Sequence, residues 1–166
     1  MTDAYPSRFN RFVDTRGVCT TPVPFTTALI NGLAPGGGLY VPTEIPTLTL
    51  EEILSLAKMP YAQRAAFIYK RFEIDLPEDV IDACMERSYG DNFDTPDICP
   101  ITSLDETTHM LELWHGPTSA FKDMALQCLP HFFSASAKAC KERGDLDHDF
   151  CILVATSGDT GKAALE

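Results

Sequence analysis

The sequence lacks the features of a membrane, secreted or nucleic-acid-binding protein. Its 166 residues contain no apolar run of transmembrane length, and residues 1–6 lack the basic and then apolar pattern of a secretory signal. Positive charge is scarce, because 13 Lys and Arg residues face 24 Asp and Glu residues and the net charge is −11. This balance argues against nucleic acid or an anionic membrane as partner. We therefore expect a cytoplasmic protein that acts on a small molecule.

The sequence also lacks a cysteine framework. No Cys-x-x-Cys pair occurs and no His stands at ligand spacing, so we expect neither a metal site nor a set of disulfides. Cys128 and Cys151 fall in apolar patterns, which predicts reduced thiols in the core. The six cysteines are Cys19, Cys84, Cys99, Cys128, Cys140 and Cys151.

The most informative residue present is Lys122. A His-Gly-Pro turn precedes it, and Thr118 and Ser119 are good N-cap residues for a helix predicted over 120–143. Lys122 then lies near the first turn, where unpaired backbone N–H groups disfavour the charged form of an amine. A partly neutral lysine can attack a carbonyl or act as a base. The alternative is a solvated surface lysine that pairs with Asp123.

A second segment about thirty residues later predicts an anion site. Residues 150–155 are a continuous apolar run typical of a fully buried parallel strand, and a helix is predicted from residue 162. The turn between them combines close backbone approach with N–H and hydroxyl donors. The residues of this cradle are Ser157, Gly158, Thr160 and Gly161. The alternative is a plain strand-to-helix turn capped by Asp159.

A triphosphate-binding loop does not fit this turn. Such a loop needs four residues between its glycines and a Ser or Thr after the Lys. Only two residues separate Gly158 from Gly161, and Ala163 follows Lys162. The spacing therefore argues against a nucleotide triphosphatase.

The remaining sequence predicts an α/β fold in two parts. We expect a small, mostly helical domain over 1–95 and the truncated start of a parallel-sheet domain over 96–166. The first part should contain a strand over 8–14 and helices over 24–32, 49–58, 60–72 and 77–89. Thr49 and Glu52 form a capping-box pattern for the second of these helices. A turn-rich linker follows over 91–100, and then strands over 101–104 and 109–113.

Three ordered motifs resemble those of threonine synthase, a family of pyridoxal-phosphate enzymes. They read GLAPGGGLYVP over 32–42, WHGPTSAFKD over 114–123 and ATSGDTG over 155–161, and TRG over 15–17 also fits the family's opening. The resemblance implies conversion of O-phospho-L-homoserine and water into L-threonine and phosphate. It covers most of the chain from about residue 5, and is weakest over 49–97.

The resemblance also assigns roles to residues. It implies that Lys122 carries pyridoxal 5′-phosphate as an imine and afterwards moves protons at the substrate's α and β carbons. The cradle at Ser157–Gly161 would bind the substrate α-carboxylate, and Asp159 would lie near the phenolic oxygen of the cofactor. His115 would contact phosphate, with a turn-stabilising role as an equal alternative.

The family is longer than this chain, and the resemblance places its cofactor-phosphate loop and its partner for the pyridine nitrogen in later segments. We therefore expect a fragment that is inactive by itself. Two other readings stay open. One is a threonine or serine dehydratase-like enzyme with the same cofactor, and the other is a non-catalytic homologue that binds a phosphorylated metabolite.

Overall fold

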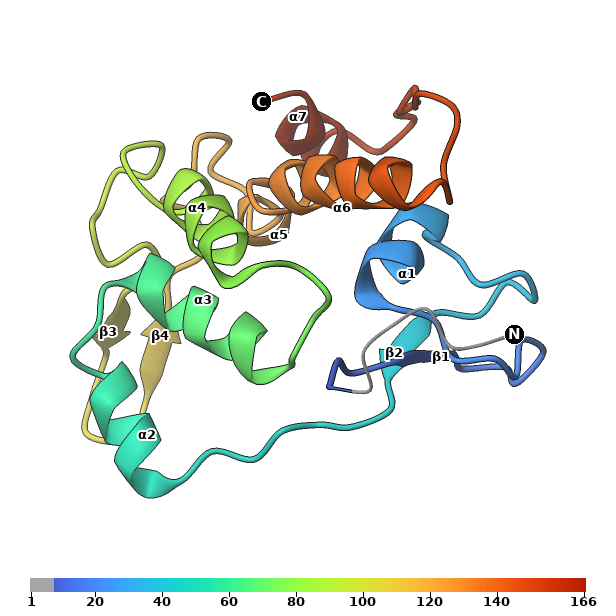
Figure 1. Ribbon diagram of the computed structural model, residues 1–166. Helices are drawn as coiled ribbons and strands as arrows, with labels where there is room; N and C mark the ends of the chain where they lie inside the picture. The colour runs from blue at the N-terminus through green and yellow to red at the C-terminus, as the bar shows by residue number, and fades with distance from the viewer. Residues whose placement is uncertain (1–7) are drawn as a thin grey trace.

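The computed structural model describes residues 8–166, so the prediction about residues 1–6 lies outside it. Short strands and helices alternate through the first part of the chain, and helices dominate the rest (Figure 1). The elements are β1 (Phe12–Asp14), α1 (Phe25–Asn31), β2 (Tyr40–Pro42), α2 (Leu50–Leu56), α3 (Tyr61–Arg71), α4 (Glu78–Ser88), β3 (Ile101–Ser103), β4 (His109–Leu111), α5 (Asp123–Leu126), α6 (Leu129–Arg143) and α7 (Asp159–Leu165).

The predicted helices before residue 90 are confirmed, with bounds within about two residues of those expected. The strand predicted over 8–14 is shorter and covers only Phe12–Asp14. The capping box of α2 is present: the Thr49 hydroxyl accepts from the N–H of Glu52, and the Glu52 carboxylate accepts from the N–H of Thr49. Gly32 follows α1 as its C-cap with φ 68°, a conformation that glycine adopts without steric cost. Local capping chemistry therefore fixes these helix ends.

The strands form two separate antiparallel pairs. β1 pairs with β2, with Val13 opposite Val41, and β3 pairs with β4, with Thr102 opposite Met110. The two pairs lie on opposite sides of the molecule in Figure 1.

The Asp14 carboxylate accepts from three backbone N–H groups just after β1, and these bonds lower its pKa.

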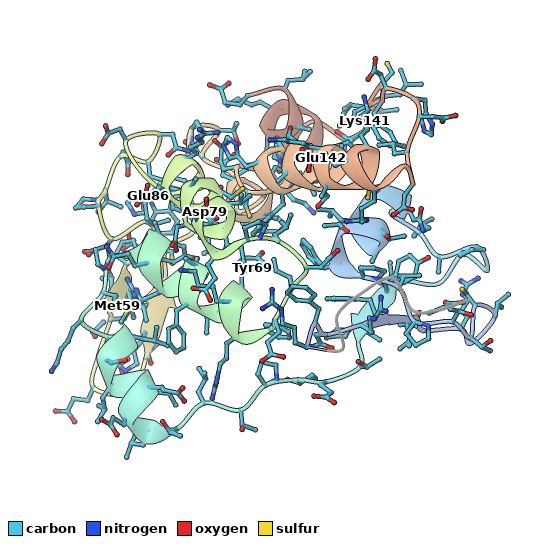
Figure 2. The ribbon with its side chains drawn as sticks, viewed as in Figure 1. Met59, Tyr69, Asp79, Glu86, Lys141 and Glu142 are labelled. Atoms are coloured by element: carbon cyan, nitrogen blue, oxygen red, sulfur yellow. The ribbon has the colours of Figure 1, made fainter. Side chains whose placement is uncertain are left out.

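The core forms where α6 meets the earlier helices. In Figure 1, α6 passes over α1 at one end and lies beside α4 at the other, and both helices contact it. Phe132 of α6 has its ring centroid 4.6 Å from that of Tyr69 on α3 and 5.6 Å from that of Phe25 on α1. Tyr69 is labelled in Figure 2. Ile81 and Met85 of α4 are almost fully buried beside them, and each contributes about 1.5–3 kcal/mol through burial.

This core joins residues from both sides of the predicted boundary at residue 95. Cys128 and Phe132 belong to the same buried cluster as Ala66, Ile81 and Met85. The division into 1–95 and 96–166 therefore stays a prediction, and across it α6 packs on α1 and α4.

The predicted parallel sheet is wrong for the residues described. Both sheets are antiparallel, and residues 150–155 form no strand. A parallel strand needs neighbours that satisfy its N–H and C=O groups, and no strand within 8–166 pairs with this segment. Leu153 is 90% exposed as a result, and Cys151 is exposed rather than in the core, whereas Cys128 is buried as predicted.

The predicted single helix over 120–143 is divided into α5 and α6. Pro130 explains the division, because it has no N–H to donate to the carbonyl of Leu126, the last residue of α5. Pro130 occupies the first turn of α6, where a missing N–H costs little. Lys122 therefore directly precedes a four-residue helix rather than starting a long one.

Candidate active site

Lys122 lies at the N-cap position of α5, on the loop that follows β4. Its side chain is half-buried, and its amine lies 5.0 Å from the centroid of the Phe121 ring. Within residues 8–166 the amine makes no hydrogen bond or ion pair. The position is therefore open for the amine to react with a ligand.

The loop before Lys122 is closed by the buried carboxylate of Asp123. One carboxylate oxygen accepts from the backbone N–H of Thr118 at 2.8 Å, and the other accepts from the Thr118 hydroxyl at 2.7 Å. Asp123 is fully buried and Thr118 nearly so. This contact differs from the predicted capping by Thr118 and Ser119, because the carboxylate is the acceptor and Ser119 has φ 56°.

His115 is held between two carboxylates. Its Nε2 lies 2.7 Å from Glu112, and its Nδ1 contacts Asp94 on the loop after α4. The hydrogen bond to Glu112, followed by that to Asp94, raises the pKa of His115 above its ordinary value. The hydrogen bond from the Thr102 hydroxyl, followed by that from His115, lowers the pKa of Glu112. Both ring nitrogens are thus engaged, which favours the turn-stabilising role over a phosphate contact.

The predicted cradle forms the turn into α7. Gly158 is the N-cap with φ 122°, a backbone conformation that residues with a Cβ rarely adopt. The Thr156 hydroxyl accepts from the N–H of Gly161 at 2.7 Å and from that of Gly158 at 3.3 Å. Three other N–H groups of the turn have no hydrogen-bond partner in residues 8–166. They belong to Ser157, Asp159 and Thr160.

The two predicted parts of the site lie together in space. α5 and α7 are in contact. The amine of Lys162 on α7 donates to the carbonyl of Thr118 at 3.3 Å, four residues before Lys122. The loop that carries the Lys122 amine is therefore joined to a turn whose N–H groups are partly unpaired within residues 8–166.

Sequence reasoning missed Asp123 as a structural residue, and Glu112 as a partner of His115. Asp123 was considered only as a partner of Lys122. Its true contacts depend on the chain reversing at Gly116, which brings Thr118 back over the carboxylate. A Thr that directly follows a Gly-Pro pair and stands five residues before an Asp is the signal that was available.

The described residues were also compared with what a metal site or a membrane-spanning helix requires. Residues 8–166 contain no cluster of three or more His, Cys, Asp or Glu side chains placed to bind a metal ion. None of the helices in the same part of the chain is both long and apolar enough to cross a lipid bilayer.

Comparison with known proteins identifies the class of protein to which this fold, with its Lys122 loop and its turn over 157–161, belongs. The family described as "Threonine synthase N terminus" matches residues 11–89. A solved structure of threonine synthase from Brucella melitensis with bound pyridoxal phosphate superposes with a TM-score of 0.72 at 34% identity, over 81% of this chain and 28% of that one. The chain is therefore homologous to the N-terminal region of the threonine synthase family.

Curated relatives point to the same family. The chain is 41% identical over 145 residues to human threonine synthase-like 1, which covers 85% of this chain and 18% of the relative. It is 38% identical over 158 residues to threonine synthase from Corynebacterium glutamicum, covering 92% and 32%. The chain thus spans about a fifth to a third of the length of the relatives it matches.

Proposed function

We propose that this chain is the N-terminal part of a threonine synthase and that Lys122 is the residue that holds its pyridoxal phosphate. The reaction would convert O-phospho-L-homoserine and water into L-threonine and phosphate. The observation that supports this most is the hydrogen bond between Lys162 and the carbonyl of Thr118, since it joins the loop of Lys122 to the helix that follows the turn over 157–161. Homology to threonine synthases supports the choice of reaction.

The residues present fit the attachment of this cofactor. An amine without a polar partner among residues 8–166 can react with an aldehyde, and Phe121 beside it gives an apolar wall. When bound, the cofactor would supply an electron sink for charge at the substrate α carbon. Once released from the cofactor, the Lys122 amine would take and return protons at the α and β carbons, because it already lies within the site.

The turn over 157–161 is proposed to bind the substrate carboxylate. The N–H groups of Gly158 and Gly161 already donate to Thr156, so the available donors are the other N–H groups and the hydroxyls of Ser157 and Thr160. The two glycines allow the backbone to approach the ligand closely. Asp159 remains proposed as a neighbour of the cofactor ring, and its side chain is exposed at the start of α7.

His115 is the weakest of these proposals. A histidine held by Glu112 and Asp94 carries positive charge more readily, since both carboxylates favour its protonated form. Such a charge would attract a phosphate only if one carboxylate gave up its hydrogen bond. We therefore propose that His115 fixes the loop, and that it meets the phosphate only if Asp94, which is largely exposed, moves away.

A hybrid protein tests the proposal. The chain would replace the corresponding third of threonine synthase from Corynebacterium glutamicum, and release of threonine and phosphate from O-phosphohomoserine would be measured. Lys122→Ala should abolish turnover. Lys138→Ala should leave it unchanged, because Lys138 lies on α6 with its side chain 78% exposed. Turnover by the Lys122→Ala hybrid, or formation of a keto acid from threonine instead, would contradict the proposal.

The proposal also covers the cellular location and the partners of the protein. We propose a cytoplasmic enzyme with O-phosphohomoserine as its small-molecule partner and with neither nucleic acid nor membrane bound. We also propose that the 166-residue chain alone turns over no substrate, because the resemblance places the loop for the cofactor phosphate outside it.

A further inference from the structure

The loop that presents Lys122 contains a buried charge that the proposed reaction does not use. Asp123 is fully buried, yet residues 8–166 place no cation against its carboxylate. A buried carboxylate is costly unless its oxygens accept hydrogen bonds, and Thr118 supplies one to each oxygen. Two bonds from one residue to both oxygens fix the carboxylate plane as well as its position.

The contact closes a ring of six residues with Lys122 inside it. The ring runs from Thr118 to Asp123, and the N–H of Asp123 also donates to the carbonyl of Ala120. Because Lys122 directly precedes Asp123, the anchored carboxylate holds the backbone next to Lys122 in place. The carbonyl of Thr118 accepts from Lys162, so the same residue also joins this ring to α7.

The close approach of Gly116 indicates that the ring tolerates little displacement. A Cβ added at Gly116 would lie 2.5 Å from the Cβ of Asp123 and 2.5 Å from its Oδ2. Neither atom is the end of a long, flexible side chain, so a larger residue at 116 would push the carboxylate away from Thr118. Glycine is therefore needed here for space, and the backbone before Thr118 packs directly on Asp123.

We propose that Asp123 is a positioning residue for the amine of Lys122, acting through its two hydrogen bonds to Thr118. The inference rests on the proposed role of Lys122 and extends it, because it states what aims the amine. Asp123 touches neither substrate nor cofactor in this proposal. Its effect is on the geometry of attack, where a displacement of about 1 Å can cost about 100-fold in rate.

Covalent labelling within one molecule tests the inference. The hybrid protein proposed above, freed of its cofactor, is mixed with a small amount of pyridoxal 5′-phosphate, which forms a C=N bond to a lysine with loss of water. Borohydride then reduces that bond, and peptide mass spectrometry measures the label at Lys122 and at Lys138. Lys138 is the internal control, because its exposed amine lies on α6 away from the loop. The readout is the ratio of the two labels.

The variants form a matched set at one position. Thr118→Val keeps the shape and the backbone N–H but removes the hydroxyl, and it should lower the ratio about tenfold. Thr118→Ser keeps the hydroxyl and should restore the ratio to within about twofold of the original. Thr118→Ala is the second variant if Val disturbs folding, since it places no methyl group against the carboxylate. Circular dichroism before labelling checks that each variant is folded.

The outcomes separate the inference from the proposed function. If the folded Thr118→Val or Thr118→Ala hybrid labels Lys122 as well as the unsubstituted hybrid does, the positioning role of Asp123 is refuted, and the role of Lys122 stands. If the unsubstituted hybrid labels Lys122 no faster than Lys138, the proposed role of Lys122 fails, and the inference fails with it. A change that affects both lysines equally would indicate a structural effect alone and would also overturn the inference.

Discussion

The Asp75 carboxylate holds three parts of the chain together, so its removal should destabilise the fold strongly. Its side chain is only 3% exposed. One oxygen accepts from the N–H of Thr26 on α1 at 2.9 Å, and the other accepts from the Thr26 hydroxyl at 2.6 Å. Arg143, at the end of α6, donates to the same hydroxyl at 3.0 Å and lies 3.6 Å from the carboxylate. The contact therefore ties the loop after α3 to α1 and α6.

The expected magnitude follows from what Asp75→Ala would leave unpaired. A hydrogen bond to a charged group contributes about 1.5–3 kcal/mol, and two from buried Thr26 would be lost. The Arg143 side chain is partly solvated, so losing its ion pair with Asp75 adds less to the destabilisation. We expect Asp75→Ala to lower the free energy of unfolding by about 3–5 kcal/mol, and the melting temperature by roughly 10 °C.

Urea denaturation followed by circular dichroism measures this change. Asp147→Ala is the matched control, because it removes the same group from a side chain that is 99% exposed, and it should cost no more than about 0.5 kcal/mol. A double variant with Thr26→Val should be less destabilised than the sum of the single changes, since both remove the same bonds. The reasoning is refuted if Asp75→Ala and Asp147→Ala unfold within about 1 kcal/mol of each other.

Three further predictions concern single sites. The raised pKa of His115 means that its stabilisation is fully present below the unfolded pKa of about 6.5 and is lost as pH rises through the higher folded pKa. The urea midpoint of the original chain should therefore fall as pH rises from about 6.5 through the folded pKa of His115, where Glu112 is ionised, and His115→Gln should make this fall smaller. An unchanged dependence of the midpoint on pH in the variant would contradict this. A thiol reagent should modify exposed Cys151 at least about tenfold faster than buried Cys128, and equal rates would show that the core opens readily. Thr49→Ala should speed amide exchange in α2 by about fivefold, which corresponds to the loss of about 1 kcal/mol of capping, and Thr49→Ser should not.

The parts of the fold that local chemistry controls were predictable. The capping box at Thr49 and the glycine after α1 both mark helix ends through contacts within a few residues, and the structure has helices there. The two strands β3 and β4 were also predicted, although β3 ends at Ser103 rather than at residue 104 and β4 ends at Leu111 rather than at residue 113. Their antiparallel pairing was not predicted. Local preference failed where a single residue interrupts a pattern, as Pro130 does between α5 and α6.

The sequence proposes the residues of the candidate site but not their arrangement. Lys122 and the turn over 157–161 were identified from residue type and order. Their contact through Lys162 and Thr118 joins residues 44 positions apart, which no local pattern encodes. The apolar run over 150–155 shows the opposite case, because its composition predicts a buried strand that has no paired neighbour within the residues described.

By itself the sequence determined the helix ends before residue 90, the kinship with threonine synthases and the identity of the amine expected to react. Those properties depend on residue types at short or fixed spacing. Only the tertiary structure decided that Asp123 anchors the loop of Lys122, that His115 lies between Glu112 and Asp94, and that α6 completes the core begun by α3 and α4. The physical reason is that a buried polar group is stable only with its partners in place, and the fold, not the local sequence, brings those partners together.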